Sequence, residues 1–167
     1  GEEGWRYDYG CLPMKDLSCR DCSTNIGNQN PDYTGLLRNL PVNCEDNEAL
    51  TQFKLHNEGH DKASYRYRCC TDADFGDQFH LGDERQTGWN DEGAGQIAFL
   101  DRHSVDCGGE PINQFKLERR GDNRMRYEFT CERGGQLGQH FDHRYTGNND
   151  GKWKNEIIYL EIGRAHV

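Results

Sequence analysis

The sequence is poor in apolar residues and contains no long apolar run. Hydrophobic residues make up 33% of the 167 positions, and charged residues make up 29%. A membrane-spanning helix needs about 18 or more consecutive apolar residues, so we expect no insertion into a membrane. A conventional apolar core would also be thin for a chain of this length.

Positive charge is scarce as well. The chain has 20 Lys and Arg against 29 Asp and Glu, which gives a formal net charge of −9. Proteins that bind nucleic acids normally present a basic face to the phosphates. The charge balance therefore argues against a nucleic-acid partner and against an anionic membrane surface.

The sequence also lacks the common catalytic and processing motifs. It has no GxSxG, HExxH or P-loop pattern and no Asn-x-Ser/Thr glycosylation site. We therefore expect no enzymatic activity and no N-glycosylation. No signal peptide is visible at Gly1, and we interpret the chain as a mature or internal fragment of a secreted protein.

Cysteine, in contrast, is abundant, with eight residues. Small extracellular domains with thin cores are commonly stabilised by disulfides, which restrict the unfolded chain. The cysteine content therefore indicates an oxidising compartment and an extracellular, secreted protein.

Two stretches of the chain resemble each other. CEDNEALTQFKLHNEGHDKASYRYRC at Cys44–Cys69 aligns with CGGEPINQFKLERRGDNRMRYEFTC at Cys107–Cys131, and the four residues QFKL are identical at Gln52–Leu55 and Gln114–Leu117. Self-similarity at a fixed spacing is typical of repeat proteins. It predicts that Cys44 pairs with Cys69 and Cys107 with Cys131.

The similarity extends upstream, where Leu37 aligns with Leu100 and Val42 with Val105. The repeat unit is therefore about 60 residues long. The last six residues, IGRAHV, match the translation of a common sequencing-library adapter. We interpret the chain as the end of a preceding repeat (1–11), two repeats (12–70 and 71–131), the start of a further repeat (132–161) and an adapter-derived tail (162–167).

Both copies show the alternation of a half-buried strand. Tyr127 and Phe129 are expected to face the core, with Glu128 and Thr130 facing water. HNEGHDK and RRGDNR are expected to form hairpin turns, in which Gly59 and Gly121 can adopt positive φ. The predicted fold is all-β, made of tandem disulfide-looped β repeats.

Four cysteines have no partner assigned by this pattern: Cys11, Cys19, Cys22 and Cys70. They allow three pairings, between which the sequence does not choose. Strict repetition would pair Cys11 with a cysteine upstream of Gly1 and would leave one of the other three odd.

The order of cysteine, glycine-containing turn, INQFKL strand and aromatic-x-aromatic-x-Cys resembles the repeat of the dermatopontin family of extracellular-matrix proteins. The family's Asp-Arg-x-Trp motif is only partly matched, because Tyr65 and Tyr127 replace the Trp and the Asp-Arg pair is matched only loosely, by Asp122 and Arg124. The resemblance implies an all-β fold with looped disulfides. It also implies roles in matrix assembly and cell adhesion, or in carbohydrate binding and agglutination as in invertebrate relatives.

Two loops at matching repeat positions could bind a glycan, because each places a tryptophan beside amide and carboxylate groups. The candidate residues are Trp89, Asn90, Asp91, Asn149, Asp150 and Trp153. The competing interpretation, which we favour, is that these tryptophans pack one repeat onto the next.

Metal sites have weaker support. Asp72, Asp74 and Asp77 offer oxygen ligands for calcium, but turn chemistry also explains them and no EF-hand pattern is present. Zinc at Cys19 and Cys22, or at His56 and His60, would need a second ligand pair that is not evident. We expect no cofactor, with calcium as the one candidate.

These observations predict a secreted structural protein of the extracellular matrix or of a filament, which self-associates through contacts between repeats and strand edges. The alternative is a secreted multivalent lectin or agglutinin, in which equivalent loops bind glycans.

Overall fold

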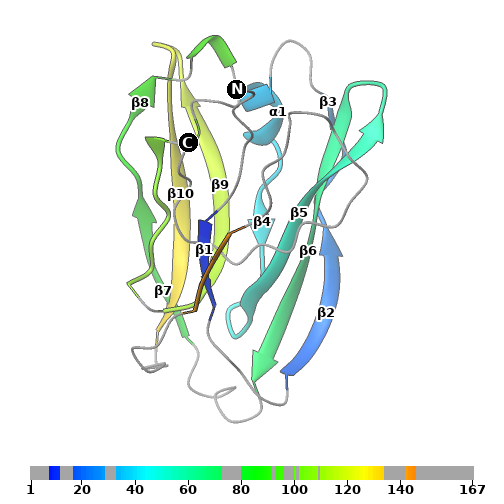
Figure 1. The fold of residues 1–167 in the computed structure, drawn as a ribbon, viewed down its shortest axis with the longest axis vertical. Coiled ribbons are helices and arrows are strands. Elements are labelled where there is room, and N and C mark those ends of the chain that lie inside the picture. The colour runs from blue at the N-terminus through cyan, green and yellow to red at the C-terminus, as the bar shows by residue number, and fades with distance from the viewer. Residues whose placement is uncertain are drawn as a thin grey trace.

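The computed structural model describes residues 8–11, 17–28, 33–72, 80–91, 93–95, 100, 102–108, 110–133 and 142–145. In this part the chain is mostly β-strand with almost no helix, so the all-β prediction is confirmed. Two antiparallel sheets face each other, and a short additional pair joins β1 (Asp8–Cys11) to β11 (Asp142–Tyr145) (Figure 1).

The first sheet is built on a long hairpin. β5 (Ala49–Gly59) pairs with β6 (Lys62–Asp72), and the other side of β6 pairs with β2 (Leu17–Ser23) and β3 (Gly27–Asn28). β2 therefore forms an outer edge of this sheet.

The second sheet is built on a second hairpin, β9 (Ile112–Arg120) and β10 (Arg124–Arg133). β10 also pairs with β7 (His80–Gln86) and β8 (Asn90–Asp91). The opposite side of β9 pairs with β4 (Val42–Asn43), which lies just before β5 in the chain. The two halves of the sequence are thus joined by a strand pairing.

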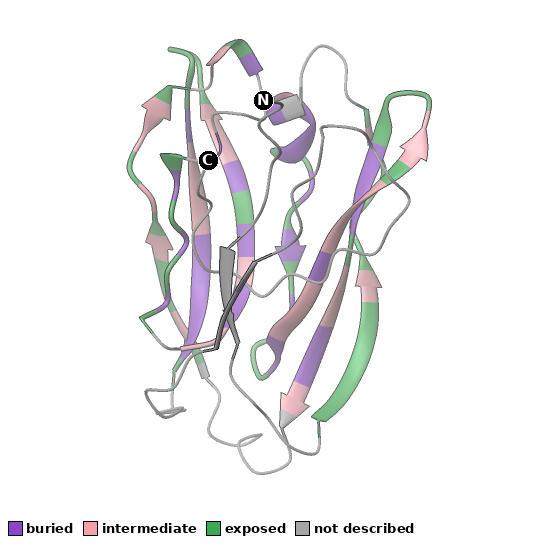
Figure 2. Ribbon diagram, viewed as in Figure 1, coloured by how far each residue is buried: buried purple, intermediate pink, exposed green. Residues whose placement is uncertain are grey.

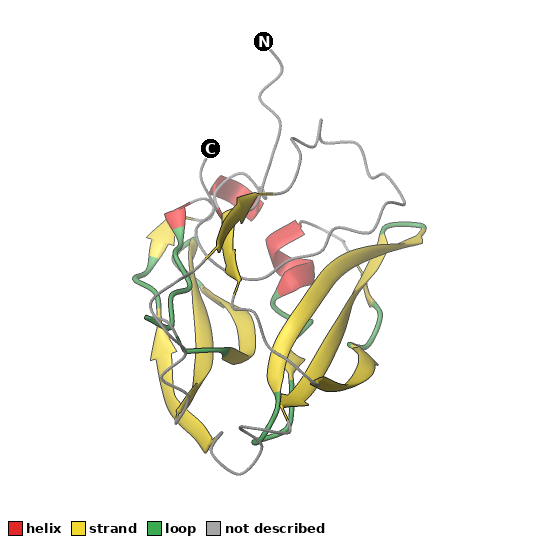
Figure 3. Cartoon of the chain, turned by 60° about the horizontal axis from the view of Figure 1, so that its bottom comes forward, coloured by secondary structure: helices red, strands yellow, loops and turns green. Residues whose placement is uncertain are grey.

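The helical content is limited to short segments. α1 (Tyr33–Leu37) lies between the two sheets (Figure 3), and η1 (Gly93–Gly95) is a single 3₁₀ turn. No helix among the described residues has the length and apolar character needed to cross a membrane.

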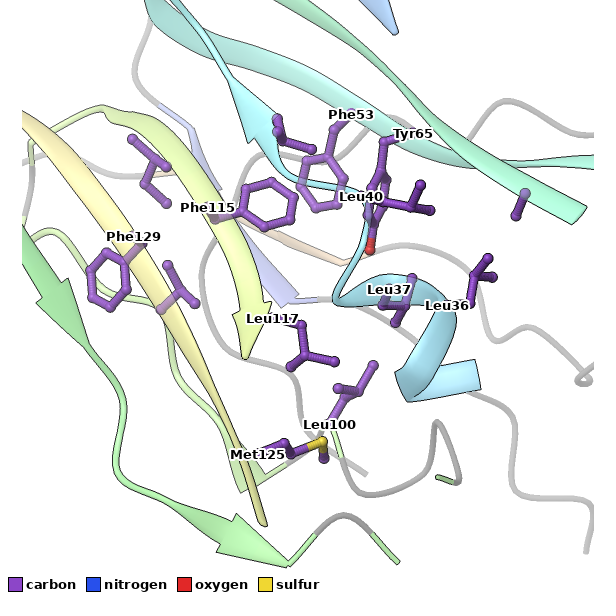
Figure 4. Close-up of a cluster of buried hydrophobic side chains, with 14 of the residues drawn as sticks. Leu36, Leu37, Leu40, Phe53, Tyr65, Leu100, Phe115, Leu117, Met125 and Phe129 are labelled. Carbon is purple, nitrogen blue, oxygen red and sulfur yellow. The ribbon is translucent and has the colours of Figure 1, made fainter. Parts of the chain in front are cut away.

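The two sheets and α1 share one buried core, in which side chains from both hairpins meet (Figure 4). The ring of Phe115 lies 4.9 Å from that of Phe53 and 5.7 Å from that of Tyr65. The core also contains Leu36, Leu37, Leu40, Val42, Leu100, Val105, Leu117, Met125 and Phe129. The described part of the chain therefore forms one closed body rather than two separate cores.

The hairpin turns agree with the sequence prediction only in part. Gly59 has φ of 80°, as expected, and is followed by His60 and Asp61, both with positive φ. Two consecutive residues of positive φ form the primed turn that suits tight hairpins. Gly121 can adopt positive φ but does not, and Asn123 does so instead, at 59°. Asparagine also tolerates the left-handed region, so it closes this three-residue turn.

The predicted alternation along β10 holds for the aromatic residues and fails for one polar residue. Phe129 is buried, and Tyr127 packs against the core. Thr130, which was expected to face water, is also buried. It pairs with Gln114 of β9 and Glu84 of β7, so strands flank it on both sides.

A threonine anchors the central strand of each sheet in the same way. The backbone N–H of Tyr65 donates to Thr24 Oγ1 at 3.0 Å, and that of Tyr127 donates to Thr87 Oγ1 at 2.9 Å. In return, the backbone N–H of each threonine donates to the carbonyl of the same tyrosine, at 2.9 Å in both cases. These bonds tie the end of each outer strand to its hairpin.

Candidate functional site

Three disulfides link six of the described cysteines. The structure pairs Cys44 with Cys69 and Cys107 with Cys131, which are the pairs predicted from the repeat. It also pairs Cys19 with Cys70, a choice that the sequence left open. Three disulfides indicate that the chain folds in an oxidising environment.

Cys22 on β2 has no disulfide partner among the described residues. Its side chain is half-buried opposite Tyr67 of β6. Burial raises the pKa of the Cys22 thiol, and the nearby Arg20 guanidinium only partly opposes this rise. Because the thiolate is the reactive form, Cys22 is not an activated nucleophile. The side chain of Cys11 lies outside the described residues.

Arg20 on β2 holds the loop that follows Cys44. Its guanidinium donates two hydrogen bonds of 2.7 Å to the Glu48 carboxylate, which is nearly buried and also accepts from the backbone N–H of Glu45. These bonds lower the pKa of Glu48, with the Arg20 hydrogen bond as the largest cause. The edge strand is therefore tied to the sandwich by an ion pair as well as by a disulfide.

The described residues contain one group of three candidate metal ligands, Cys44, Glu48 and Cys69. Two of these ligands are the sulfurs of a disulfide, so they do not bind zinc as thiolates. Of the residues considered for zinc, Cys19 is in a disulfide, and neither His56 nor His60 belongs to a group of three candidate ligands among the described residues. The calcium candidates Asp74 and Asp77, and the side chain of Asp72, lie outside the described residues.

The candidate glycan loop at Trp89 is occupied by the protein's own side chains. The guanidinium carbon of Arg126 lies 4.3 Å from the centre of the Trp89 ring, and that of Arg120 lies 5.0 Å away. Asn90 donates to the carbonyls of Gly88 and Arg102 at 3.3 and 3.4 Å.

Asp91 is also engaged, because it accepts the backbone N–H of Gly93 at 2.8 Å. Trp89, Asn90 and Asp91 therefore lie close together, as predicted for a site. Their side chains, however, contact other groups of the protein and attach this loop to the sheet. Trp89 is not part of the shared core, and its arginine partners come from the adjacent hairpin. The equivalent candidates Asn149, Asp150 and Trp153 lie outside the described residues.

We predict that Trp89→Ala leaves the fold intact and lowers the free energy of unfolding by about 1–2 kcal/mol, because the partly buried Trp89 ring loses its cation–π contact with Arg126. Chemical denaturation with circular dichroism would measure the change. A loss of several kcal/mol would contradict this assignment and place Trp89 in the core instead.

The sequence pattern did not reveal one unusual pair, Glu132 of β10 and Asn113 of β9. Both side chains are fully buried. Neither carboxyl oxygen of Glu132 has a hydrogen-bond partner, and Asn113 Oδ1 has none either. The only available signal was a glutamate directly after Cys131, at the position where the first copy has Cys70.

Comparisons with known proteins give no relative for this chain: no family model, curated protein or solved structure matches it. Its function is therefore inferred from the geometry described above.

Proposed function

We propose that the chain is a structural protein of the extracellular matrix or of an extracellular filament, and that it associates with itself through strand edges. The observation that carries the proposal is the exposure of β2, the strand at one edge of the sandwich (Figure 2). In the described part of the chain no strand pairs with its outer edge. Unpaired edges are templates for pairing with another chain.

We further propose that the protein is built from tandem disulfide-looped β repeats of about 60 residues. The matching threonine–tyrosine bonds at Thr24 and Thr87 support this, as do the disulfides that close each hairpin. An array of such repeats would present an edge strand in each unit, which favours assembly over a single binding event.

The partner that fits β2 best is a second copy of the chain. Apolar side chains are exposed near both ends of this edge, at Leu17 and at Ile26, and Leu81 is exposed on the outer strand β7 of the other sheet. In a heterologous contact, the β2 edge of one copy would meet the β7 edge of the next. Such a contact would bury these groups and, because it does not close on itself, would continue into a filament. The three disulfides are consistent with secretion.

The direction of the backbone groups on β2 follows from two observations. The Cα atoms of Cys19 and Cys70 are 4.1 Å apart, the short spacing of a non-hydrogen-bonded antiparallel pair. Thr24, an even-numbered residue, donates its backbone N–H to the Tyr65 carbonyl. Odd-numbered residues such as Ser23 therefore direct their N–H groups outward, and even-numbered residues such as Ser18 direct theirs to β6.

This parity gives a matched test. Ser23→Pro removes an outward donor and should convert the assembly to monomers, while the free energy of unfolding changes by about 0.5 kcal/mol or less. Ser18→Pro removes an inward donor and should cost about 1 kcal/mol of stability while leaving assembly in place. Light scattering would measure mass, with and without reductant, and denaturation would measure stability.

A wild-type protein that stays monomeric at every accessible concentration would contradict the proposal. So would an assembly that Ser23→Pro leaves unchanged, because the contact would then use another surface. The lectin alternative stays a prediction, and its untested candidate is Trp153.

A further inference from the structure

Glu132 and Asn113 lie beside each other at an irregularity in the second sheet. The register between β9 and β10 shifts after the Thr130–Gln114 pair, because Cys131 pairs with Ile112. Asn113 therefore lies opposite the peptide bond between Thr130 and Cys131. Glu132 donates its own backbone N–H to the Pro111 carbonyl at 2.8 Å. The bulge turns both side chains into the protein, where each is fully buried.

The orientation of the Asn113 amide is fixed by its hydrogen bonds. Its Nδ2 donates to the carbonyls of Glu45 and Glu48, both at 2.7 Å, which only the NH₂ group can do. The backbone N–H of Cys44 also donates to the Asn113 carbonyl at 3.2 Å. Asn113 therefore fastens the 44–48 loop of the first half to the second sheet, and its Oδ1 is left for another donor.

β7 closes this region on its other side. A β-carbon at Gly82 would collide with the carbonyl oxygen of Cys131, so only glycine allows β7 to approach β10 this closely. Leu81 pairs with Glu132. Water is thus kept from a carboxyl group that has no partner, and an unpaired buried charge is strongly unfavourable.

The charged groups around Glu132 do not neutralise it. Asp46, in the 44–48 loop, acts on it as a like charge. The cations on the adjoining elements are paired elsewhere: Arg20 with Glu48, Arg85 with Glu110, and Arg133 with Asp83. No cation among the described residues contacts Glu132.

We propose that Glu132 keeps its proton in mildly acidic solution and donates a hydrogen bond to Asn113 Oδ1, so that the pair forms a proton-dependent latch between the two sheets. The proton satisfies both partners, because it gives the carboxyl group an O–H that can donate and gives Asn113 Oδ1 a hydrogen bond to accept.

Ionisation of Glu132 has a defined consequence for the latch. A carboxylate offers only acceptors, so it would face Asn113 Oδ1 without a bond and would compete for the Nδ2 hydrogens. Those hydrogens now hold the carbonyls of Glu45 and Glu48. Deprotonation therefore weakens the attachment of the 44–48 loop to β9.

The pH range follows from the pKa of Glu132, which burial raises from 4.5 to about 7, with Asp46 adding to the rise and the Asn113 amide opposing it. Because the folded pKa exceeds the unfolded one, the folded state holds the extra proton. The stabilisation is complete below about pH 4.5 and is lost as the pH rises to about 7. The folding equilibrium constant should fall by about two orders of magnitude over this range from this group alone.

The test is an NMR titration of the Asn113 side-chain amide in the wild-type protein, together with unfolding measurements across the same pH range. We expect the Asn113 resonances to move with a midpoint near pH 7. Glu132→Gln, which keeps a donor without a titrating group, should remove that transition and be more stable than wild type at pH above 7. The matched control is Glu128→Gln on the same strand, because Lys116 lowers the pKa of Glu128 and the Asn113 midpoint should not change.

A wild-type midpoint below about pH 5 would overturn the latch, since Glu132 would then be largely ionised by about pH 6. A midpoint near 7 that persists in Glu132→Gln would overturn it by assigning the transition to another group. A shift of the Asn113 resonances on adding calcium alone at alkaline pH would also overturn it, because the three oxygens would then hold a cation. The wild-type titration is decisive even if a variant fails to fold.

Discussion

Phe115→Ala is expected to lower the free energy of unfolding by about 3–5 kcal/mol, the usual cost of truncating a buried phenylalanine. Phe115 lies where the sheets meet, and its ring contacts those of Phe53, Tyr65 and Tyr127 at centroid distances of 4.9, 5.7 and 6.3 Å. Removing it leaves a cavity between two rigid sheets, which can collapse only in part. Guanidinium denaturation followed by tryptophan fluorescence and circular dichroism would measure the loss.

Lys116→Ala is the control for this prediction. Lys116 is the next residue on β9, faces outward, and forms a 2.7 Å ion pair with Glu128. Its side chain is about half exposed, so its removal should cost about 1 kcal/mol or less. Similar losses for Phe115→Ala and Lys116→Ala would mean that the sheets do not pack through Phe115.

Phe53→Ala extends the test to cooperativity. Phe53 and Phe115 occupy equivalent positions in the QFKL segments and touch each other across the core. Each variant should therefore shift the same single unfolding transition, and a double-mutant cycle should give a coupling of about 0.5–1.5 kcal/mol. Two transitions, each moved by only one of the variants, would show that the halves unfold as separate units.

The sequence predicts the local part of this fold well. The alternation of apolar and polar residues determines which side chains of β5, β6, β9 and β10 face inward. Strands that are separated by only a short turn pair with each other as hairpins. The same alignment places Cys44 near Cys69 and Cys107 near Cys131. These features depend on contacts within one hairpin, so a repeated pattern of about 25 residues carries enough information to predict them.

Contacts between the halves could not be predicted in the same way. Val42 belongs to the first copy by sequence, yet it pairs with Phe115 of the second. No periodicity indicates which sheet a two-residue strand joins. The Cys19–Cys70 bond likewise depends on the register of β2 against β6, and β2 has no apolar alternation to fix that register.

The surroundings of the candidate site residues could not be predicted from the sequence either. Trp89 was recognised as an aromatic group beside Asn90 and Asp91, but its occupation by Arg126 depends on the register of β8 against β10. Glu132 has the sequence context of a surface residue after a strand cysteine. Its burial results from a bulge and from the glycine that lets β7 approach, and neither feature has a pattern in the sequence.

The second large effect concerns the disulfides that close the two hairpins. Replacing Cys107 and Cys131 together by alanine should lower the free energy of unfolding by about 3 kcal/mol, because the bond spans 24 residues and its loss frees the unfolded chain. Replacing Cys44 and Cys69, which are separated by 25 residues, should cost a similar amount. Thermal and chemical denaturation would measure both.

The Cys19–Cys70 bond should behave differently, although its separation of 51 residues predicts a larger entropic effect of about 4 kcal/mol. It attaches β2, whose side chains are almost all exposed, so breaking it should release the edge strand before the core unfolds. Cys19 is exposed, whereas all four cysteines of the other two disulfides are buried.

Mild reduction of the folded protein, followed by alkylation and peptide mass mapping, should therefore label Cys19 and Cys70 first. Cys22 serves as an internal reference, because it can be alkylated without reductant. Earlier labelling of Cys107 and Cys131 would contradict the burial of the hairpin disulfides. If the order holds, reductant acts first on the strand proposed to mediate assembly, so loss of polymer under mild reduction would precede loss of the fold.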